Sequence, residues 1–260
     1  DTKMYFLTGD CGQNIKNGSF ATDFYHNVYK ILWNNDKGVD INRKIDTSCL
    51  GICQHGFDII SCQFAIHYFF KNLQLLEGFI ENLVENIKEN GFFIGTCFDG
   101  KTIFEYLQHL DQDSKIGHQI NDNQIWNIKK LYQHHKMKDD ESSLGMEIDV
   151  YVSSIGEYQK EYLVNFNYFA SLMAKYGFEL IEPEDCSTFN IPCGTNNKSS
   201  GLFDKMYKNM HLESNTHNMN SSKYGSALSL ELQSEIQKYS FFNRWFIFRK
   251  TGSGTKVKKI

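Results

Sequence analysis

The sequence predicts an α/β fold in which helices cover both faces of a parallel sheet, and three observations lead to this prediction. Apolar runs that are typical of buried strands cover residues 57–62 and 92–98. Between them, apolar residues recur at three- and four-residue spacing from Leu73 to Ile87, which is typical of one face of a helix. A strand, a helix and a strand in this order predict parallel strands joined by a crossover helix.

The remaining elements are predicted one by one from their own patterns. Asn90 and Gly91 should end the first helix, because glycine adopts the left-handed conformation readily. Further strands are expected at residues 4–10, 124–131, 146–152, 178–181 and 241–250. Further helices are expected at residues 24–33, 102–110, 161–176 and 202–210, the last within an Asn-, Ser- and Gly-rich loop over residues 193–226.

Length and composition narrow the class of protein. The 260 residues suffice for one sizeable core, and the net charge of −4 argues against a general, sequence-independent grip on nucleic acid. No apolar run approaches the roughly 18 residues that a membrane span needs, and we expect neither a membrane segment nor a secretion leader. Cys49, Cys53 and His55 lie close together, but without a second ligand cluster they predict a polar loop and no metal site.

The most informative segment is residues 61–68, directly after the strand at residues 57–62. It presents the amide of Gln63, the rings of Phe64 and Tyr68, and the imidazole of His67. Ligands of open α/β sheets bind at the carboxyl ends of parallel strands. Aromatic rings at such a position suit a flat heterocycle. The segment therefore predicts a ligand site.

With these residues assembled, the chain resembles the mRNA cap guanine-N7 methyltransferases, and most of all the methyltransferase domains of capping enzymes from large DNA viruses. Residues 57–68 match the most specific motif of that family almost letter for letter. Residues 91–96, 161–164, 175–178 and 246–250 fit further segments. The resemblance covers most of residues 4–250. It implies a Rossmann-like class I methyltransferase sheet with helices on both faces and a cap-binding elaboration.

The resemblance also implies a function: methyl transfer from S-adenosylmethionine to N7 of the guanosine cap of mRNA. His67 and Tyr68 would contact the cap base, and the Glu161 carboxylate would hydrogen-bond the guanine edge. Three residues would bind the methyl donor, namely Asp10, Gln63 and Phe64. No catalytic base is implied, because the mechanism depends on positioning. An aromatic residue of the closing strand, within residues 241–245, would complete the cap pocket, and the sequence does not decide which.

One departure from the family concerns the donor site. The glycine-rich loop after the first strand and the acid after the second strand are not in this chain. We therefore expect residues 1–250 to be a methyltransferase domain that lacks its N-terminal donor-loop strands, and residues 251–260 to be a flexible tail. The implied partner is the capped 5′ end of RNA, together with upstream triphosphatase and guanylyltransferase domains or a stimulatory subunit. The location would be cytoplasm or virion for a viral protein, and the nucleus for a cellular one.

Two other functions stay open at this point. The first is a non-catalytic, methyltransferase-like module that binds RNA ends or a partner subunit, which the absent donor loop favours. The second is a methyltransferase of the same fold that acts on a small molecule. The joint presence of the His-Tyr pair and Glu161 argues against the second, because an arbitrary acceptor gives no reason for all three residues.

Overall fold

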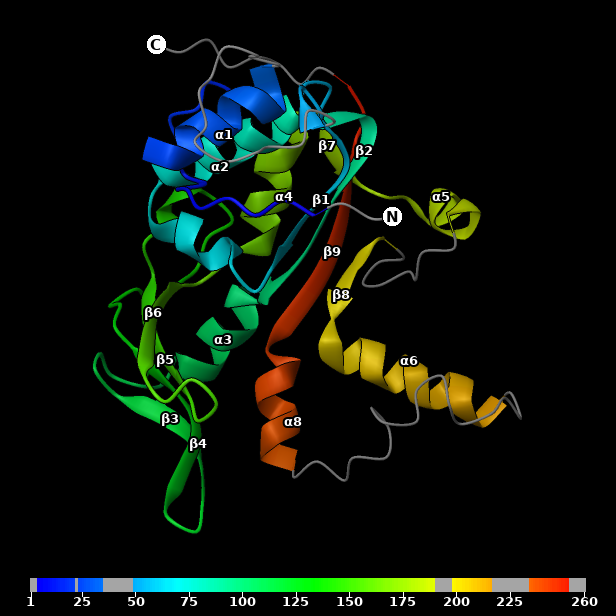
Figure 1. Cartoon of the computed structure of the whole chain (residues 1–260). Helices are drawn as coiled ribbons and strands as arrows, with labels where there is room; N and C mark the ends of the chain where they lie inside the picture. Colours follow the sequence, from blue (N-terminus) through cyan, green and yellow to red (C-terminus); the bar gives the residue numbers. More distant parts are fainter. Residues whose placement is uncertain (1–3, 22, 35–48, 190–197, 217–233, 253–260) are drawn as a thin grey trace.

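The structure is a computed structural model that describes residues 4–21, 23–34, 49–189, 198–216 and 234–252. Its two sheets and the surrounding helices are shown in Figure 1. The strands are β1 Phe57–Gln63, β2 Ile87–Phe98, β3 Lys115–Ile120, β4 Asn123–Lys130, β5 Glu147–Val152, β6 Tyr158–Tyr162, β7 Phe178–Leu180, β8 Ser200–Leu202 and β9 Asn243–Lys250. The α-helices are α1 Asp23–Asn34, α2 Leu73–Asn86, α3 Gly100–Leu107, α4 Phe166–Lys175, α5 Pro183–Thr188, α6 Phe203–Thr216 and α8 Ser234–Phe241, and the short 3₁₀ helices are η2 Ile66–Lys71 and η3 Glu141–Ser143.

The first sheet has the strand order β1-β2-β9-β7, with β8 also paired to β9. Strands β1 and β2 are parallel and joined by α2, as the sequence predicted. Strand β9 is antiparallel to β2, β7 and β8, so the prediction of a wholly parallel sheet is wrong beyond the first pair. The reason lies at the end of β2, where the Asp99 N–H donates to the Phe242 carbonyl at 2.7 Å. The closing strand starts beside this end of β2 and must run back along it.

The α/β class is confirmed, and helices lie on both faces of the first sheet. Helices α2 and α4 pack on one face, where a buried core joins Leu76, Ile80 and Phe169 to Phe93 and Phe246 of the sheet. On the opposite face, Phe189 at the end of α5 packs against Phe92, with ring centroids 5.7 Å apart. Successive side chains of a strand point to opposite faces, so Phe93 packs toward α2 and α4 and Phe92 packs toward α5.

Helix α2 ends four residues earlier than predicted. Its C-terminal cap is Ile87, and β2 starts at the same residue, so Asn90 and Gly91 lie within the strand. The buried Lys250 ammonium explains this ending, because it donates to the Val84 and Ile87 carbonyls at 2.9 Å each. A cation on the last carbonyls of a helix satisfies their hydrogen bonds and complements the helix dipole.

The predicted buried strand at residues 4–10 is wrong. These residues have no regular secondary structure, and Met4 and Phe6 are 74% and 85% exposed. In the described part of the chain no strand pairs with them, and a single unpaired strand is unstable in water. The segment that follows is held instead by the buried Asn82 of α2, whose amide bonds the backbones of Cys11, Gln13 and Ile15.

The second sheet is antiparallel, with the order β3-β4-β5-β6. Strands β4 and β5 confirm two predictions, whereas β6 replaces the start of a predicted helix. Glu161 lies on β6 opposite Ile148, and α4 begins only at Phe166, where the Asn165 side chain accepts from the Tyr168 N–H. An N-cap side chain fixes where a helix begins, so the apolar periodicity alone placed this start too early.

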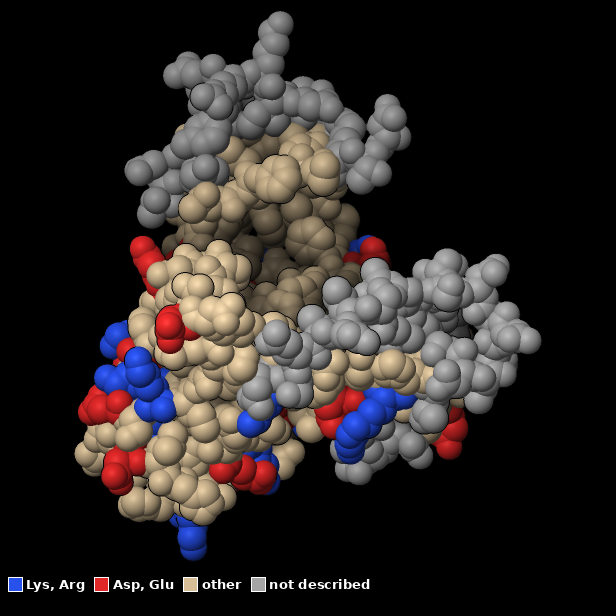
Figure 2. Space-filling model, turned by 90° about the horizontal axis from the view of Figure 1, so that it is seen from below, with Lys and Arg blue, Asp and Glu red and all other residues tan. Residues whose placement is uncertain are grey.

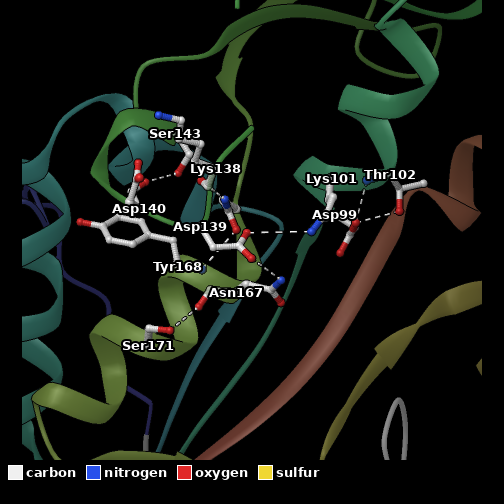
Figure 3. Close-up of polar contacts among 11 residues, drawn as sticks. Asp99, Lys101, Thr102, Lys138, Asp139, Asp140, Ser143, Asn167, Tyr168 and Ser171 are labelled. Atoms are coloured by element: carbon white, nitrogen blue, oxygen red, sulfur yellow. Dashed lines mark hydrogen bonds and ion pairs between the residues drawn. The ribbon is translucent and has the colours of Figure 1, made fainter. Parts of the chain in front are cut away.

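The loop between β4 and β5 ties the second sheet to α3 and α4 (Figure 3). The Asn165 amide donates to the Lys138 carbonyl at 2.7 Å, and the Asn167 amide donates to the Asp139 carboxylate at 3.0 Å. The start of α3 packs closely against Val164, the residue that follows β6 by two positions. The Gly100 N–H donates to the Val164 carbonyl, and a Cβ at position 100 would lie 2.5 Å from that oxygen. These contacts hold β6 in place beside the end of β1.

Two sequence predictions concern residues outside the described part. The flexible tail was predicted for residues 251–260, of which residues 253–260 are not described. Helix α6 confirms the helix expected near residues 202–210, although most of the loop around it is not described.

Candidate active site

The site begins where β1 ends. Phe64 follows Gln63 with a φ of +51°, which is rare for a bulky side chain. Its N–H donates to the Thr96 carbonyl and hydroxyl at 2.9 and 3.2 Å, and these bonds hold the turn. The Phe64 ring is 54% exposed and meets the Phe203 ring of α6 edge-to-face, 6.3 Å between centroids. Backbone strain of this kind persists where the surrounding structure enforces it, and it often marks functional sites.

The helix η2 then brings two more predicted residues together. His67 is buried, and Tyr68 is 48% exposed. Their rings lie 4.1 Å apart, at an interplanar angle of 57°. A large aromatic ring that stays half-exposed beside a buried imidazole is available to a ligand.

Glu161 approaches this pair from the second sheet. Its Oε2 lies 3.6 Å from His67 Nδ1, and both side chains are almost wholly buried. This distance is longer than a hydrogen bond. Neither Glu161 Oε2 nor His67 Nε2 has a hydrogen-bond partner among the described residues. Buried polar atoms without partners are uncommon in folded proteins, and a ligand is one way to satisfy them.

Burial sets the protonation of this pair. It lowers the pKa of His67 to about 4 and raises the pKa of Glu161 to about 7. An attractive ion pair would move both pKa values the other way, so the cost of burying charge exceeds the attraction. Near neutral pH His67 is therefore neutral. Burial, followed by the charge of Glu161, also raises the pKa of the Tyr68 and Tyr239 hydroxyls, which keeps both protonated.

These side chains line one cavity of about 420 Å³. The face on which the second sheet, α6 and α8 lie is hollowed at its centre, where almost all visible atoms belong to uncharged residues (Figure 2). Glu161 is the one charged residue among the described residues that line the cavity. The lining residues are Phe64, His67, Tyr68, Phe98, Val152, Ser154, Ile155, Gln159, Glu161, Phe203, Tyr239, Ser240 and Asn243.

Two of the predicted site residues lie outside this lining. The Gln63 amide donates to the Ser61 hydroxyl and accepts from the Thr96 hydroxyl, at 2.9 and 2.8 Å. Asp10 is exposed, and its carboxylate accepts from the Gly12 N–H at 2.8 Å.

The closing strand contributes to the cavity differently from the sequence expectation. Of residues 241–245, only Asn243 lines the cavity, while Phe242 is buried in the core of the second sheet. Helix α8, directly before the closing strand, contributes the ring of Tyr239 to the cavity instead. This ring packs against Phe98 and Trp126, with centroids 5.5 Å away in each case. Tyr239 and Gln159 were missed because residues 234–241 were not recognised as a helix and residues 158–162 were not recognised as a strand.

Comparison with known proteins assigns the chain to a family. Residues 5–239 match the mRNA (guanine-N(7))-methyltransferase domain. The chain belongs to this family. A probable mRNA-capping enzyme of Acanthamoeba polyphaga mimivirus is 31% identical over 213 residues, which are 76% of this chain and 17% of that protein. The resemblance seen in the sequence is thereby confirmed.

Cellular members of the family match a shorter part of the chain. The mRNA cap guanine-N(7) methyltransferase of Cryptococcus neoformans var. neoformans serotype D (strain JEC21 / ATCC MYA-565) is 28% identical over 128 residues, 48% of this chain and 19% of that protein. The mRNA cap guanine-N(7) methyltransferase 1 of Arabidopsis thaliana is 30% identical over 126 residues, 48% of this chain and 32% of that protein. The chain thus spans between about a sixth and a third of the length of these three relatives.

Within the described residues, no group of three or more His, Cys, Asp or Glu side chains could hold a metal ion. Cys49 and Cys53, which the sequence analysis considered as metal ligands, are buried in a small cluster with Ile31 and Leu32 of α1. None of the helices in the described part is long and apolar enough to span a bilayer.

Proposed function

We propose that the protein containing this chain transfers a methyl group from S-adenosylmethionine to N7 of the guanosine cap of mRNA. One observation carries the proposal: His67 and Tyr68 of η2 and Glu161 of β6 in the second sheet line one cavity. Membership of the guanine-N7 methyltransferase family supports it.

The cavity offers the groups that a guanine base requires. The Glu161 carboxylate would accept from the N1–H and the 2-amino group of the base. The neutral His67 ring has one N–H, which either nitrogen can carry, and this N–H would donate to the keto oxygen. Tyr68 would lie against the flat face of the ring. His67 Nε2 and Glu161 Oε2, which have no partner among the described residues, would then both be satisfied.

The same groups favour the product of the reaction. N7 of guanine carries a lone pair and no proton, so the attack requires no general base. Methylation leaves the purine positively charged, and a carboxylate at its edge stabilises that charge as it develops. The Tyr68 ring adds a cation–π contribution of about 0.5 to 2 kcal/mol. The remaining acceleration would come from holding the two reactants in line.

Residues at the end of β1, directly after it and before α1 fit the methyl donor. Phe64 is exposed, and among the described residues one N–H of the Gln63 amide has no partner and the Asp10 carboxylate accepts one hydrogen bond, from Gly12, so its second oxygen could accept from an amino group. S-adenosylmethionine, when bound there, supplies a methyl group on a positively charged sulfur. Phe64 would shield the transfer from water and direct it toward the cavity that it also lines.

Methyl transfer from labelled donor to guanosine-capped RNA tests the proposal in the full-length protein. Glu161→Ala should reduce the rate by about 100-fold, the loss typical of removing one electrostatic group from a reaction site. Glu157→Ala is the matched control, because this exposed glutamate lies four residues away in the same hairpin and does not line the cavity. Full activity in Glu161→Ala would refute the role assigned to this residue.

Two further measurements separate the other functions. A non-catalytic module would bind capped RNA, but calorimetry would detect no S-adenosylmethionine binding to the full-length protein. A small-molecule methyltransferase would bind the donor, but a cap dinucleotide would not raise its melting temperature. The proposed function requires both ligands to bind.

A further inference from the structure

The cavity continues past Glu161 toward the hairpin between β5 and β6. Gln159 lies two residues before Glu161 on the same face of β6 and lines the same cavity. This spacing separates the two residues by about 6.6 Å along the strand. The Gln159 side chain forms no hydrogen bond with the residues that the structure describes. Its amide therefore presents a donor and an acceptor to the cavity.

The wall of the cavity runs from a closed end to an open mouth. His67 and Glu161 are buried, with side-chain exposures of 6% and 13%. At the other extreme, Ile155 in the hairpin is 61% exposed. Gln159, which is partly buried, lies between these ends. Along this wall, Gln159 therefore lies between the buried pair and the exposed hairpin.

The order of groups around guanine matches this order along the wall. The keto oxygen is followed by N1–H, then the amino group, and then the side of the ring that carries the ribose. With the keto oxygen at His67 and the amino group at Glu161, the ribose extends past Glu161 and away from His67. The cavity volume of about 420 Å³ lies within the roughly 300–1,000 Å³ of pockets that hold whole small molecules. It therefore has room for more than the base.

We propose that Gln159 binds the ribose of the capping guanosine. Its amide oxygen accepts from one of the two neighbouring ribose hydroxyls, and its amide N–H donates to the other. This role extends the proposed function and depends on it. Gln159 is a specificity residue, because a cap nucleoside without the free diol leaves the amide unsatisfied in the cavity wall.

Isothermal titration of the full-length protein with cap dinucleotides tests this inference. The ligands are GpppA and two versions whose capping guanosine carries a 2′-deoxyribose or a 3′-O-methylribose. The wild type should bind each modified ligand about five- to tenfold more weakly than GpppA. Gln159→Leu, which keeps the size of the side chain, should bind GpppA weakly and no longer distinguish the three ligands.

Gln119→Leu is the matched control. Gln119 is exposed on β3, at the opposite edge of the same sheet, and this variant should discriminate as the wild type does. Equal affinity of the wild type for the three ligands would overturn this inference but leave the proposed function standing. Unchanged discrimination in Gln159→Leu would do the same. Absence of GpppA binding to the wild type would overturn the proposed function and this inference with it. Should Gln159→Leu fail to fold, the wild-type ligand series still decides.

Discussion

At the residue scale, His67 and Glu161 together hold one proton. Burial moves the pKa of Glu161 from 4.5 to about 7 and that of His67 from 6.5 to about 4. Between about pH 4.5 and 6.5 the folded pair keeps its proton on Glu161, whereas the unfolded chain keeps one on His67. The raised pKa of Glu161, taken alone, would make the fold less stable as pH rises toward 7. The lowered pKa of His67, taken alone, would make the fold less stable as pH falls toward 4. In this window the two effects oppose each other, so the pair changes stability little.

The affinity for the cap should depend on pH even though the stability of the fold changes little. A guanine edge donates two N–H groups and therefore needs Glu161 as a carboxylate. Below pH 7, binding of GpppA releases the Glu161 proton, so the affinity should rise by about tenfold per pH unit. Above pH 7 Glu161 is already ionised, and the affinity should level off. Titration calorimetry from pH 5.5 to 8.5, in buffers of different ionisation enthalpy, measures both the slope and the protons released.

Glu161→Gln provides the comparison for this pH dependence. It removes the titrating group and should flatten the slope while it weakens binding. A slope that persists in this variant would assign the titration to another group.

The residues found and missed in the sequence differ in one physical respect. His67, Tyr68 and Phe64 lie next to one another in the chain, so a local motif reveals them. Glu161 was found through the family resemblance. Gln159 carries no motif, and its role follows only from the two-residue periodicity of a strand that the pattern of residues 158–162 did not reveal.

At the element scale, a buried ion pair joins the parts that surround the cavity. Arg244 Nε of β9 lies 2.7 Å from the Asp99 carboxylate, which also caps α3 by accepting from the Thr102 N–H. The Arg244 guanidinium also donates to the Ser200 hydroxyl of β8 and lies over the Phe166 ring of α4. One side chain thereby fixes the relative positions of β2, β8, β9 and the two helices.

Arg244→Met should destabilise the fold strongly, because it leaves the Asp99 carboxylate buried without its cation. The expected loss in the free energy of unfolding is about 3 to 5 kcal/mol, measured by chemical denaturation. Asp99→Asn combined with Arg244→Met should recover part of that loss.

The exposed pair Lys198–Glu182, at 2.7 Å, supplies the control for this experiment. Lys198→Met should change the free energy of unfolding by no more than about 1 kcal/mol, because exposed ion pairs contribute little. Similar losses in Lys198→Met and Arg244→Met would contradict the importance given to burial.

The elements that sequence reasoning misplaced are those whose ends depend on distant residues. Helix α2 ends early because Lys250, more than 160 positions later, binds its last carbonyls. The segment at residues 158–162 is a strand because β5 pairs with it. Helix α1 and strand β1, in contrast, lie close to where their local apolar patterns predicted them.

At the scale of the whole molecule, the cavity exists because two sheets meet. Phe64 and helix η2, which follow β1, supply one wall, β6 supplies another, and α6 and α8 contribute Phe203 and Tyr239. The loop of residues 138–143 joins the second sheet to the start of α4 through two hydrogen bonds and to α3 through the Lys101–Asp139 ion pair at 4.0 Å (Figure 3). Periodicity predicts individual strands and helices, but it carries no information on how a second sheet docks. The convergence of Tyr68 and Glu161 could therefore be expected only from the family resemblance.

The most direct test of this convergence is a crystal structure of the full-length protein with GpppA. We expect one guanine in the cavity, stacked on Tyr68, with its N1 and amino nitrogens about 2.7 to 3.2 Å from the Glu161 carboxylate. A guanine bound outside the cavity, or one that contacts Tyr68 but leaves Glu161 unpaired, would refute the convergence of these two residues on the cap.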